Sequence, residues 1–386
     1  MEFALTTEQK LIVETVHKFV EAELYPHEAE VDRTGEIAPE LKDRIRARAI
    51  EQGLYAMNMP AEVGGGGLDN LTMMLVEKEL GRAGYALHFL LARPSMILMA
   101  CQGEQRERYL VPAVKGERID CFAITEPGAG SDAFSITTRA VVDGDDFVIN
   151  GTKHFISHAD LADFVIVFAV TGVQDTSKGS RKQVTSFLID KGTPGFVCAR
   201  QPDAVSHRGF HQCVLAFNDC RVHKRQILGA LHKGFDVANE WLFAQRLVLA
   251  ANCLGRAERI LAMAAQWAGS RKQFGQTISR FQGVSFKFAD MATELAAAEL
   301  LTLRAAWKAD QGTMTAEDAA MAKLKASEML AMVADEGVQV LGGMGVMGDV
   351  AMSRLWRDAR VERIWDGTSE IQRHIISRAV LRPFES

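Results

Sequence analysis

An acidic side chain near the end of the chain has the setting of a general base. Asp366 follows Trp365 and precedes the run Gly367-Thr368-Ser369-Glu370. The glycine frees the backbone to turn, and the groups behind it can cap a closing helix. Apolar positions recur along that helix at helical spacing, so we expect them to desolvate Asp366 and raise the pKa of its carboxyl. Such a carboxyl can accept a proton. Taken alone, the stretch also fits a surface turn with an exposed Asp.

Three other stretches have the composition of ligand-binding loops. In Ile124–Asp132, two glycines one residue apart stand between Thr and Ser, so backbone N–H groups and hydroxyls can approach a polar ligand closely. Arg271–Gly275 places two cations at a helix end, where an Arg can bind a diphosphate. Gln339–Gly345 ends another helix in glycines. Each alone also fits a hairpin turn, a solvated basic end or a helix C-cap.

Three groups of elements must position these stretches. Residues 1–120 read as helical, with a capping box at Thr6–Gln9 and apolar helical runs at 41–54, 71–80 and 85–99. Short runs rich in β-branched and aromatic residues then predict an antiparallel β-barrel or sandwich over 121–228, with strands at 146–152, 164–169, 184–189 and 213–217. Helical spacing returns over 229–386, with long helices at 241–267, 281–310 and 315–339. The fold class is therefore α+β with segregated layers.

Composition excludes several classes of function. The chain has 386 residues and a net charge of −5, with scattered basic residues, so nucleic acid and anionic membrane are poor partners. The six cysteines have no CxxC spacing and indicate reduced thiols of a cytoplasmic protein, and we expect no metal site. No uninterrupted apolar run reaches the ~18 residues of a membrane span. The start leads directly into a helix cap, so we expect no signal segment.

Taken together and in this order, the motifs resemble those of the acyl-CoA dehydrogenases, flavoproteins that desaturate acyl-CoA thioesters. The resemblance covers the whole chain and rests on ITEPGAGSD at 124–132, NGTK at 150–153, RKQFG at 271–275, QVLGG at 339–343 and GTSEIQ at 367–372. It implies an N-terminal α-domain, a β-domain and a C-terminal four-helix bundle. It also implies FAD, a homo-oligomer with a tetramer favoured, and an electron-transfer flavoprotein as electron acceptor.

The resemblance assigns residues to FAD in two groups. Near the isoalloxazine ring and phosphates it places Phe122, Ile124, Thr125, Ser131, Phe155 and Ser157. At the diphosphate and adenosine of a neighbouring subunit's FAD it places Arg271, Gln273, Phe274, Gln339, Gly342 and Gly343. Thr368 and Glu370 would meet FAD just after the base.

For the substrate, the resemblance implies Asp366 as the base that takes the α-proton of the thioester, while the β-hydrogen leaves as hydride to the flavin. The thioester carbonyl would bond to a flavin hydroxyl and to the backbone N–H of Thr368. Further substrate contacts are Ser131, Arg246, His88, Ala92, Trp365 and Gly367. His88 equally fits an ordinary core histidine.

Three departures from the family pattern bear on function, at the base, at Phe155 and at Trp365. The base position usually holds Glu, and here it is the shorter Asp366. The family's alternative base position holds Gln245, which cannot accept a proton at neutral pH. Phe155 replaces a flavin-stacking Trp. Trp365 beside the base takes up room, which favours a short acyl group or one with an unusual head.

Other functions remain open at the level of sequence. An enoyl-CoA reductase of the crotonobetainyl-CoA type runs the same site in reverse. A flavin oxidase resembling nitroalkane oxidase also uses Asp as its base. A non-catalytic flavin-binding protein is disfavoured by the intact FAD motifs and by Asp366.

Overall fold

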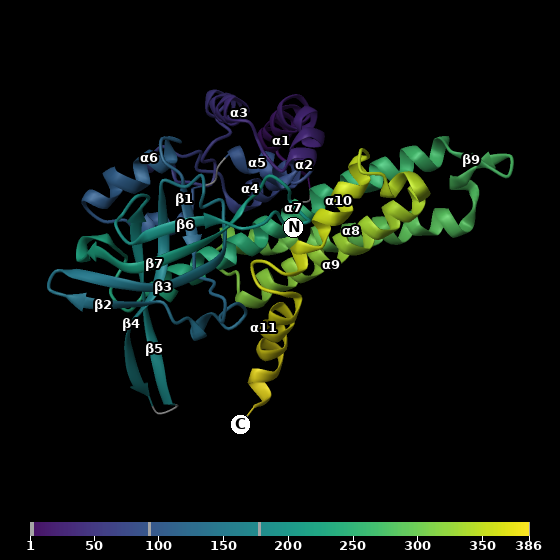
Figure 1. The fold of residues 1–386 in the computed structure, drawn as a ribbon. Helices are drawn as coiled ribbons and strands as arrows, with labels where there is room; N and C mark the ends of the chain where they lie inside the picture. Colours follow the sequence, from purple (N-terminus) through teal and green to yellow (C-terminus); the bar gives the residue numbers. More distant parts are fainter. Residues whose placement is uncertain (1–3, 92–93, 177–178, 386) are drawn as a thin grey trace.

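The computed structural model describes residues 4–91, 94–176 and 179–385 as a helical N-terminal layer, a β-sheet and a long helical bundle (Figure 1). The first layer holds α1 Thr7–Phe19, α2 Glu28–Thr34, α3 Pro39–Glu51, α4 Asn70–Leu80, α5 Tyr85–His88 and α6 Val111–Val114. The predicted capping box is present, because the Thr6 side chain accepts from the N–H of Gln9 and the Gln9 side chain accepts from the N–H of Thr6.

The predicted apolar helix over 85–99 is wrong as a continuous element. Helix α5 ends at His88, and 3₁₀ turns follow at Phe89–Leu91 and Met96–Ala100. Pro94 and Ser95 lie outside any helix, and a proline has no N–H for a helical hydrogen bond. Ala92, predicted to contact the acyl group, and its neighbour at position 93 lie outside the described residues.

The sheet forms the middle layer, and its hydrogen-bonded path runs β6-β7-β3-β2-β4-β5-β8. Its strands are β1 Asp120–Ala123, β2 Arg139–Asp143, β3 Asp146–Ser157, β4 Phe164–Thr176, β5 Gly179–Asp190, β6 Phe196–Arg200, β7 Gln212–His223 and β8 Ile227–Leu228. Most pairs are antiparallel as predicted, but β1 lies parallel to β4, with Phe122 opposite Ile166. The sequence-based prediction missed this pairing because β1 is short and joins the sheet from the preceding helical layer.

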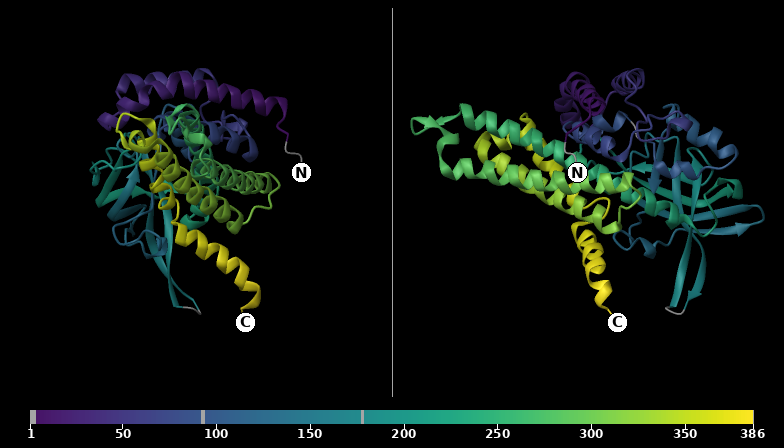
Figure 2. Two further views of the ribbon diagram at one scale, coloured as in Figure 1. Left: turned by 90° about the vertical axis from the view of Figure 1, so that its right-hand side faces the viewer. Right: turned by 180° about the vertical axis from the view of Figure 1, so that it is seen from behind.

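The bundle contains α7 Gly234–Ser270, α8 Gln282–Asp310, α9 Ala316–Leu341, α10 Ala351–Ala359 and α11 Ser369–Leu381. A hairpin of β9 Lys272–Gln273 and β10 Gln276–Thr277 joins α7 to α8 at the end farthest from the sheet (Figure 2). Helix α7 runs for 37 residues from the sheet to that hairpin. The predicted three-layer α+β class is confirmed.

One helix combines the length and the apolar character of a membrane span. It comprises α9 and the turn after it, Ala316–Val346, and 44% of its most apolar window is buried inside the protein. It packs against α7, α8, α10 and α11. Asp318 and Lys323 are buried along it. These contacts are those of the central helix of a bundle.

Helix α11 leaves the body of the molecule, as Figures 1 and 2 both show. Its buried residues are Ser369 and Gln372, in its first turn. Farther along, Val380 is 61% exposed and Leu381 is 52% exposed. The first part of α11 therefore packs against α9, and its C-terminal end is exposed.

Candidate functional site

The turn that carries Asp366 has an uncommon backbone. Asp366 has φ +52° and Gly367 has φ +96°, so two successive residues are left-handed. Asp is among the few non-glycine residues that adopt this region readily. A Cβ on Gly367 would lie 2.6 Å from Nε2 of Gln372, so only glycine fits. As predicted, the Thr368 hydroxyl then caps α11 by accepting from the N–H of Ile371 at 3.3 Å.

Asp366 is half-buried, and burial raises the pKa of its carboxyl to about 6. Lys323 and Arg246 oppose this shift, whereas Glu362 adds to it. The closing helix, expected to bury this turn, contributes its first turn, because a Cβ on Gly367 would lie 3.6 Å from Cγ2 of Ile371. Charged groups from α7, from α9 and from the turn before Asp366 face the carboxyl as well. The carboxyl can therefore gain and lose a proton near neutral pH.

Arg246, on α7, faces the same carboxylate with unused hydrogen-bonding capacity. Its side chain is buried, and its Nε and Nη1 have no hydrogen-bond partner within the described chain. Its Nη2 lies 3.8 Å from the position of a Cβ on Gly367. Burial lowers the pKa of Arg246, and Asp366 opposes this. A buried guanidinium with free donors is suited to bind oxygen atoms of a ligand.

Trp365 is fixed in place beside the base. Its Nε1 donates to Oε2 of Glu362 at 2.7 Å. The imidazole of His207 stacks on it, with ring centres 5.0 Å apart and planes at 23°. Tyr85 lies 4.9 Å away and Phe210 lies 6.4 Å away, centre to centre. The rings of Phe89 and Phe210 are 5.0 Å apart, which extends the cluster toward the sheet.

The sequence analysis did not identify His207, Phe210 and Glu362 as part of the site. His207 and Phe210 lie in the loop between β6 and β7, which is 158 and 155 residues before Trp365 in the chain. No local pattern connects them, because the contact arises only when the sheet packs on the bundle. The sequence shows that Phe210 is an aromatic residue in a loop, but it does not show that Trp365 is its partner.

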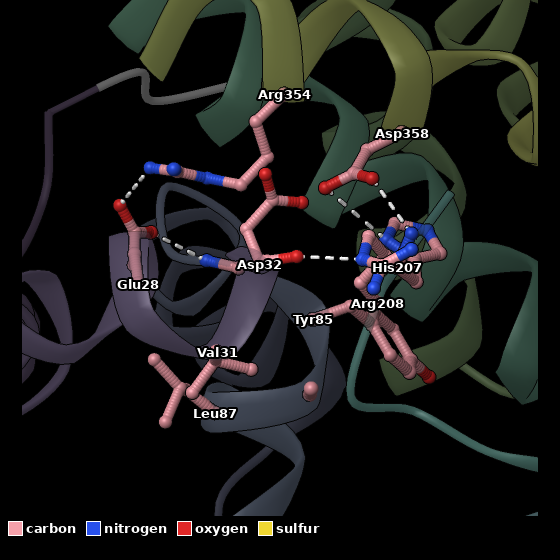
Figure 3. A pocket seen from close by; sticks show the side chains of 11 residues that line it. Glu28, Val31, Asp32, Tyr85, Leu87, His207, Arg208, Arg354 and Asp358 are labelled. Carbon is pink, nitrogen blue, oxygen red and sulfur yellow. Dashed lines mark hydrogen bonds and ion pairs between the residues drawn. The ribbon is translucent and has the colours of Figure 1, made fainter. Parts of the chain in front are cut away.

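A buried charge network continues behind Trp365. The backbone N–H of His207 donates to Oδ1 of Asp358 at 2.6 Å, and its Nε2 lies 3.1 Å from Oε1 of Glu362. Arg256 also donates to Glu362. Burial alone would lower the pKa of His207, but the two carboxylates outweigh it and raise that pKa. Figure 3 shows His207 against Asp358 beside a cavity of about 20 Å³, which has room for one water and not for a substrate.

The predicted ligand loop at 124–132 is built around a buried ion pair. Nζ of Lys153 lies 2.8 Å from Oε1 of Glu126, and both side chains are buried. The Glu126 carboxylate also accepts the N–H groups of Thr137 at 2.6 Å and Thr138 at 2.9 Å. Burial opposes ionisation of Glu126, but Lys153 and these donors hold its pKa at about 2. Cβ atoms on Gly128 and Gly130 would meet nothing within 4 Å, so space above this loop is open to a ligand.

The predicted flavin-facing residues come from β1, from the segment that follows it and from β3. Phe122 stacks on Trp241 of α7, with ring centres 4.3 Å apart. The Lys153 ammonium donates to the carbonyl of Ile124 at 3.0 Å, and the N–H of His154 donates to the carbonyl of Thr125 at 2.8 Å. Phe155 has φ +55° and is 59% exposed. Ser131 is exposed as well, whereas the Ser157 hydroxyl donates to Oε1 of Gln212 at 3.1 Å.

The second predicted group meets at the other end of the bundle. A pocket of about 400 Å³ there is lined by Gln273, Phe274, Ile278, Phe281, Lys287 and Gln339. Phe274 is 93% exposed at φ +50°, in the hairpin turn. Arg271 is exposed beside it, and Cβ atoms on Gly342 and Gly343 would meet nothing within 4 Å. This end is thus open, apolar in part and basic.

Two remaining predicted residues have other surroundings. His88 is fully buried, and its Nδ1 lies 3.0 Å from the carbonyl oxygen of Leu80, which is the setting of a core histidine. Its contact with an acyl group stays a prediction. Glu370 is exposed in the first turn of α11.

The two groups form two half-sites of the kinds that a flavin dinucleotide needs, and they lie far apart in this chain. From Trp241 to Ser270, α7 rises through roughly 44 Å at ~1.5 Å per residue. Phe122 contacts Trp241 at the start of that span. The β9–β10 hairpin, which carries the pocket residues Gln273 and Phe274, lies beyond its end (Figure 1).

Comparison with known proteins agrees with this architecture. Residues 6–117, 121–220 and 232–381 match the family models for the acyl-CoA dehydrogenase N-terminal, middle and C-terminal domains. The chain is 37% identical to a 3-(aryl)acrylate reductase of Clostridium sporogenes, over 98% of this chain and 99% of the relative. It is 36% identical to the human mitochondrial short-chain specific acyl-CoA dehydrogenase, over 98% and 91%.

Among solved structures, a chain in the structure of the electron transferring flavoprotein of Acidaminococcus fermentans superposes with a TM-score of 0.90. It is 35% identical, and the match covers 99% of this chain and 100% of that chain.

Proposed function

The chain belongs to the acyl-CoA dehydrogenase family, and from that premise we propose that Asp366 is the base that removes the α-proton of a short acyl-CoA thioester. The family's members use FAD and act on CH–CH bonds, so α,β-dehydrogenation of an acyl-CoA is the reaction of this chain. The proposal concerns the residues that carry out the reaction and the acyl group.

The observation that carries the proposal is the environment of Asp366. Its pKa of about 6 leaves it mostly ionised at neutral pH and yet basic enough to take a proton. Arg246 and Lys323 face it and favour the carboxylate before transfer. Gln245, at the family's alternative position, cannot act as a base at this pH.

The other residues bind and orient. The N–H of Thr368, the N-cap residue of α11, is the proposed donor to the thioester oxygen, where enolate charge develops. The free donors of Arg246 are suited to hold oxygen atoms of the CoA arm. Bound FAD supplies the hydride acceptor. The rings around Trp365 exclude water from the carboxylate's apolar side.

A short acyl group is supported by the ring cluster. Trp365, Tyr85, His207 and Phe210 pack against one another close behind the base. Moving Trp365 would break its hydrogen bond to Glu362. A long acyl chain would have to displace these rings, whereas a group of a few carbons would not.

Reduction of an enoyl-CoA, which is the same reaction reversed, is the second candidate. It is favoured by the 3-(aryl)acrylate reductase among the relatives and by the pKa of Asp366, since an acid with a pKa of about 6 can return a proton to carbon.

Oxidation of a nitroalkane was a further alternative. Turnover of nitroethane with oxygen, without flavin bleaching by any acyl-CoA, would favour it.

We further propose a homo-oligomer, with a tetramer favoured, in which the bundle end of one chain completes the FAD site of another. The separation of the two half-sites along α7 supports this. An electron-transfer flavoprotein is the proposed electron acceptor, supported by the structural neighbour from A. fermentans. The proposed location is cytoplasmic.

The test is anaerobic bleaching of the flavin by a panel of acyl-CoAs that differ in length, branching and head group. Asp366→Asn should retain FAD and bind acyl-CoA, but bleach at least ~10²–10⁴-fold more slowly. Near-normal bleaching by this variant would move the base elsewhere. Asp366→Glu is the companion variant. Its longer side chain in a left-handed turn should lose activity if the site has closed in around Asp.

A further inference from the structure

A buried ammonium lies beneath the turn that carries Asp366. Lys323, in the first half of α9, has no exposed surface. Its Nζ donates to the carbonyl of Gly367 at 2.9 Å. Burying a lysine in a bundle core costs free energy, and within the described residues no carboxylate lies within salt-bridge distance of Nζ. A purely structural position here would be filled more favourably by an apolar residue.

The groups that face Lys323 are those of the site itself. Asp366 is on the turn, Glu362 lies before it, and Arg246 and Cys253 are on α7. Burial lowers the pKa of Lys323, while Asp366 and Glu362 oppose that shift. Lys323 is thus a cation oriented toward Asp366 without being paired to it.

We propose that Lys323 is a positioning residue for Asp366, holding the Gly367 carbonyl so that the turn keeps its left-handed form and placing a fixed positive charge beneath the carboxylate. The proposal rests on the assignment of Asp366 as the base. It adds a residue of α9 that is buried and bonds to the backbone of the turn.

Lys323 fixes the orientation of the peptide between Gly367 and Thr368. Two left-handed residues in succession persist only where the surroundings over-determine them. The Gly367 carbonyl accepts two buried donors, Nζ of Lys323 and Nε2 of Gln372, each at 2.9 Å. If this carbonyl turned away, the N–H of Thr368 on the same peptide plane would turn with it. Lys323 therefore orients the base and the predicted carbonyl-binding donor together.

Lys323 also favours the ionised form of Asp366. Burial favours its neutral form, and Lys323 is the largest influence opposing burial. Without the ammonium, the carboxyl should hold its proton to a higher pH. Less of the enzyme would then carry an ionised base at neutral pH.

Gln372 provides a matched control, because it separates these two effects. It is fully buried and donates to the same carbonyl, but it carries no charge. Lys323→Met removes a donor and a charge, whereas Gln372→Met removes a donor only. Both replacements are unbranched and similar in length to the native side chain.

The experiment uses FAD-loaded enzyme and butyryl-CoA as the probe, with single-turnover bleaching followed from pH 5 to pH 9. Lys323→Met should slow bleaching at pH 7 by roughly 10-fold or more, and its acidic limb should move to higher pH by about one pH unit. Gln372→Met should slow bleaching with the acidic limb unmoved. Equal pH profiles for wild type and Lys323→Met, or the same displacement in both variants, would overturn the proposal.

A second measurement does not depend on turnover. Asp366→Asn should raise the melting temperature at pH 8 and leave it nearly unchanged at pH 4. The gain at pH 8 should be larger in a Lys323→Met background, where the ionised carboxylate lacks its counter-charge. An equal gain in both backgrounds would contradict the electrostatic role. If instead Asp366→Asn alone bleached normally, the base assignment would fail while this coupling still tested the placement of Lys323.

Discussion

The indole nitrogen of Trp365 donates to Glu362 at 2.7 Å while the imidazole of His207 lies against the face of the same ring. Glu362 is three residues earlier in the same segment, whereas His207 comes from the sheet. The ring beside the base is therefore fixed by two layers of the protein at once. Two carboxylates hold His207 in turn, so its imidazole is also fixed.

This fixed ring predicts the acyl-length profile. Trp365→Ala should open space behind the base and shift the preference from short toward longer acyl-CoAs, by roughly 10-fold in the ratio of kcat/KM values. Trp365→Phe is the control, since it keeps an aromatic face but cannot donate to Glu362. It should give a smaller shift in the same direction. An unchanged length profile in Trp365→Ala would mean that other residues end the acyl pocket.

The raised pKa of Asp366 predicts a pH-dependent stability. A carboxyl with a pKa of about 6 in the folded state and 3.8 unfolded destabilises the fold when ionised, by roughly 3 kcal/mol. The penalty is absent below about pH 4, grows as the pH rises to 6 and is complete above it. Asp366→Asn should therefore raise the melting temperature at pH 8 and leave it nearly unchanged at pH 4. Asn also suits the left-handed backbone. Equal shifts at both pH values would contradict the raised pKa.

The buried Lys153–Glu126 pair predicts that stability depends on pH in the opposite direction. Lys153→Met would leave the Glu126 carboxylate buried without its cation, costing ~3–5 kcal/mol of stability. Because the folded pKa of Glu126 is about 2, its contribution is present above pH 4.5 and is lost as the pH falls toward 2. Urea unfolding at pH 7 and pH 3 measures both effects. The double variant Lys153→Met/Glu126→Gln should recover part of the loss at pH 7, and no recovery would mean that packing, not charge, dominates.

The bundle-end pocket predicts how FAD is retained. Arg271→Ala removes a bidentate donor beside the pocket and should lower the flavin content after gel filtration, with the oligomer weakened as FAD is lost. Lys272→Ala, next to it and equally exposed, is the control and should retain FAD. A monomer with full flavin content would disprove the shared site.

The sequence was informative where short-range pattern decides structure. The capping box at Thr6–Gln9, the Thr368 cap and the long bundle helices follow from local spacing. The helix expected at 85–99 is not continuous, because the prediction followed the apolar run and gave no weight to Pro94, which has no N–H for a helical hydrogen bond.

The site was predictable only in part, for a physical reason. Asp366, Arg246 and the loop at 124–132 are marked by residue type. The surroundings that tune Asp366 are not, since Lys323 lies 43 positions earlier and looks like any helix lysine in sequence. The expected rise in the pKa of Asp366 agrees in direction with the structure. The charged side chains of α7 and α9 that face the carboxyl are tertiary neighbours that no window of sequence contains.

The length of α7 has a genetic consequence on the proposed shared site. Asp366 and Arg271 of one chain would serve different flavins, because they lie toward opposite ends of that helix. Two inactive alleles, Asp366→Asn and Arg271→Ala, should therefore complement each other when co-expressed. A mixed pair would contain one site with both defects and one site with neither. Conversely, an Arg271→Ala allele alone would impair flavins held by its normal partners, which is the pattern of a dominant-negative mutation, whereas an Asp366→Asn allele alone would impair only its own site.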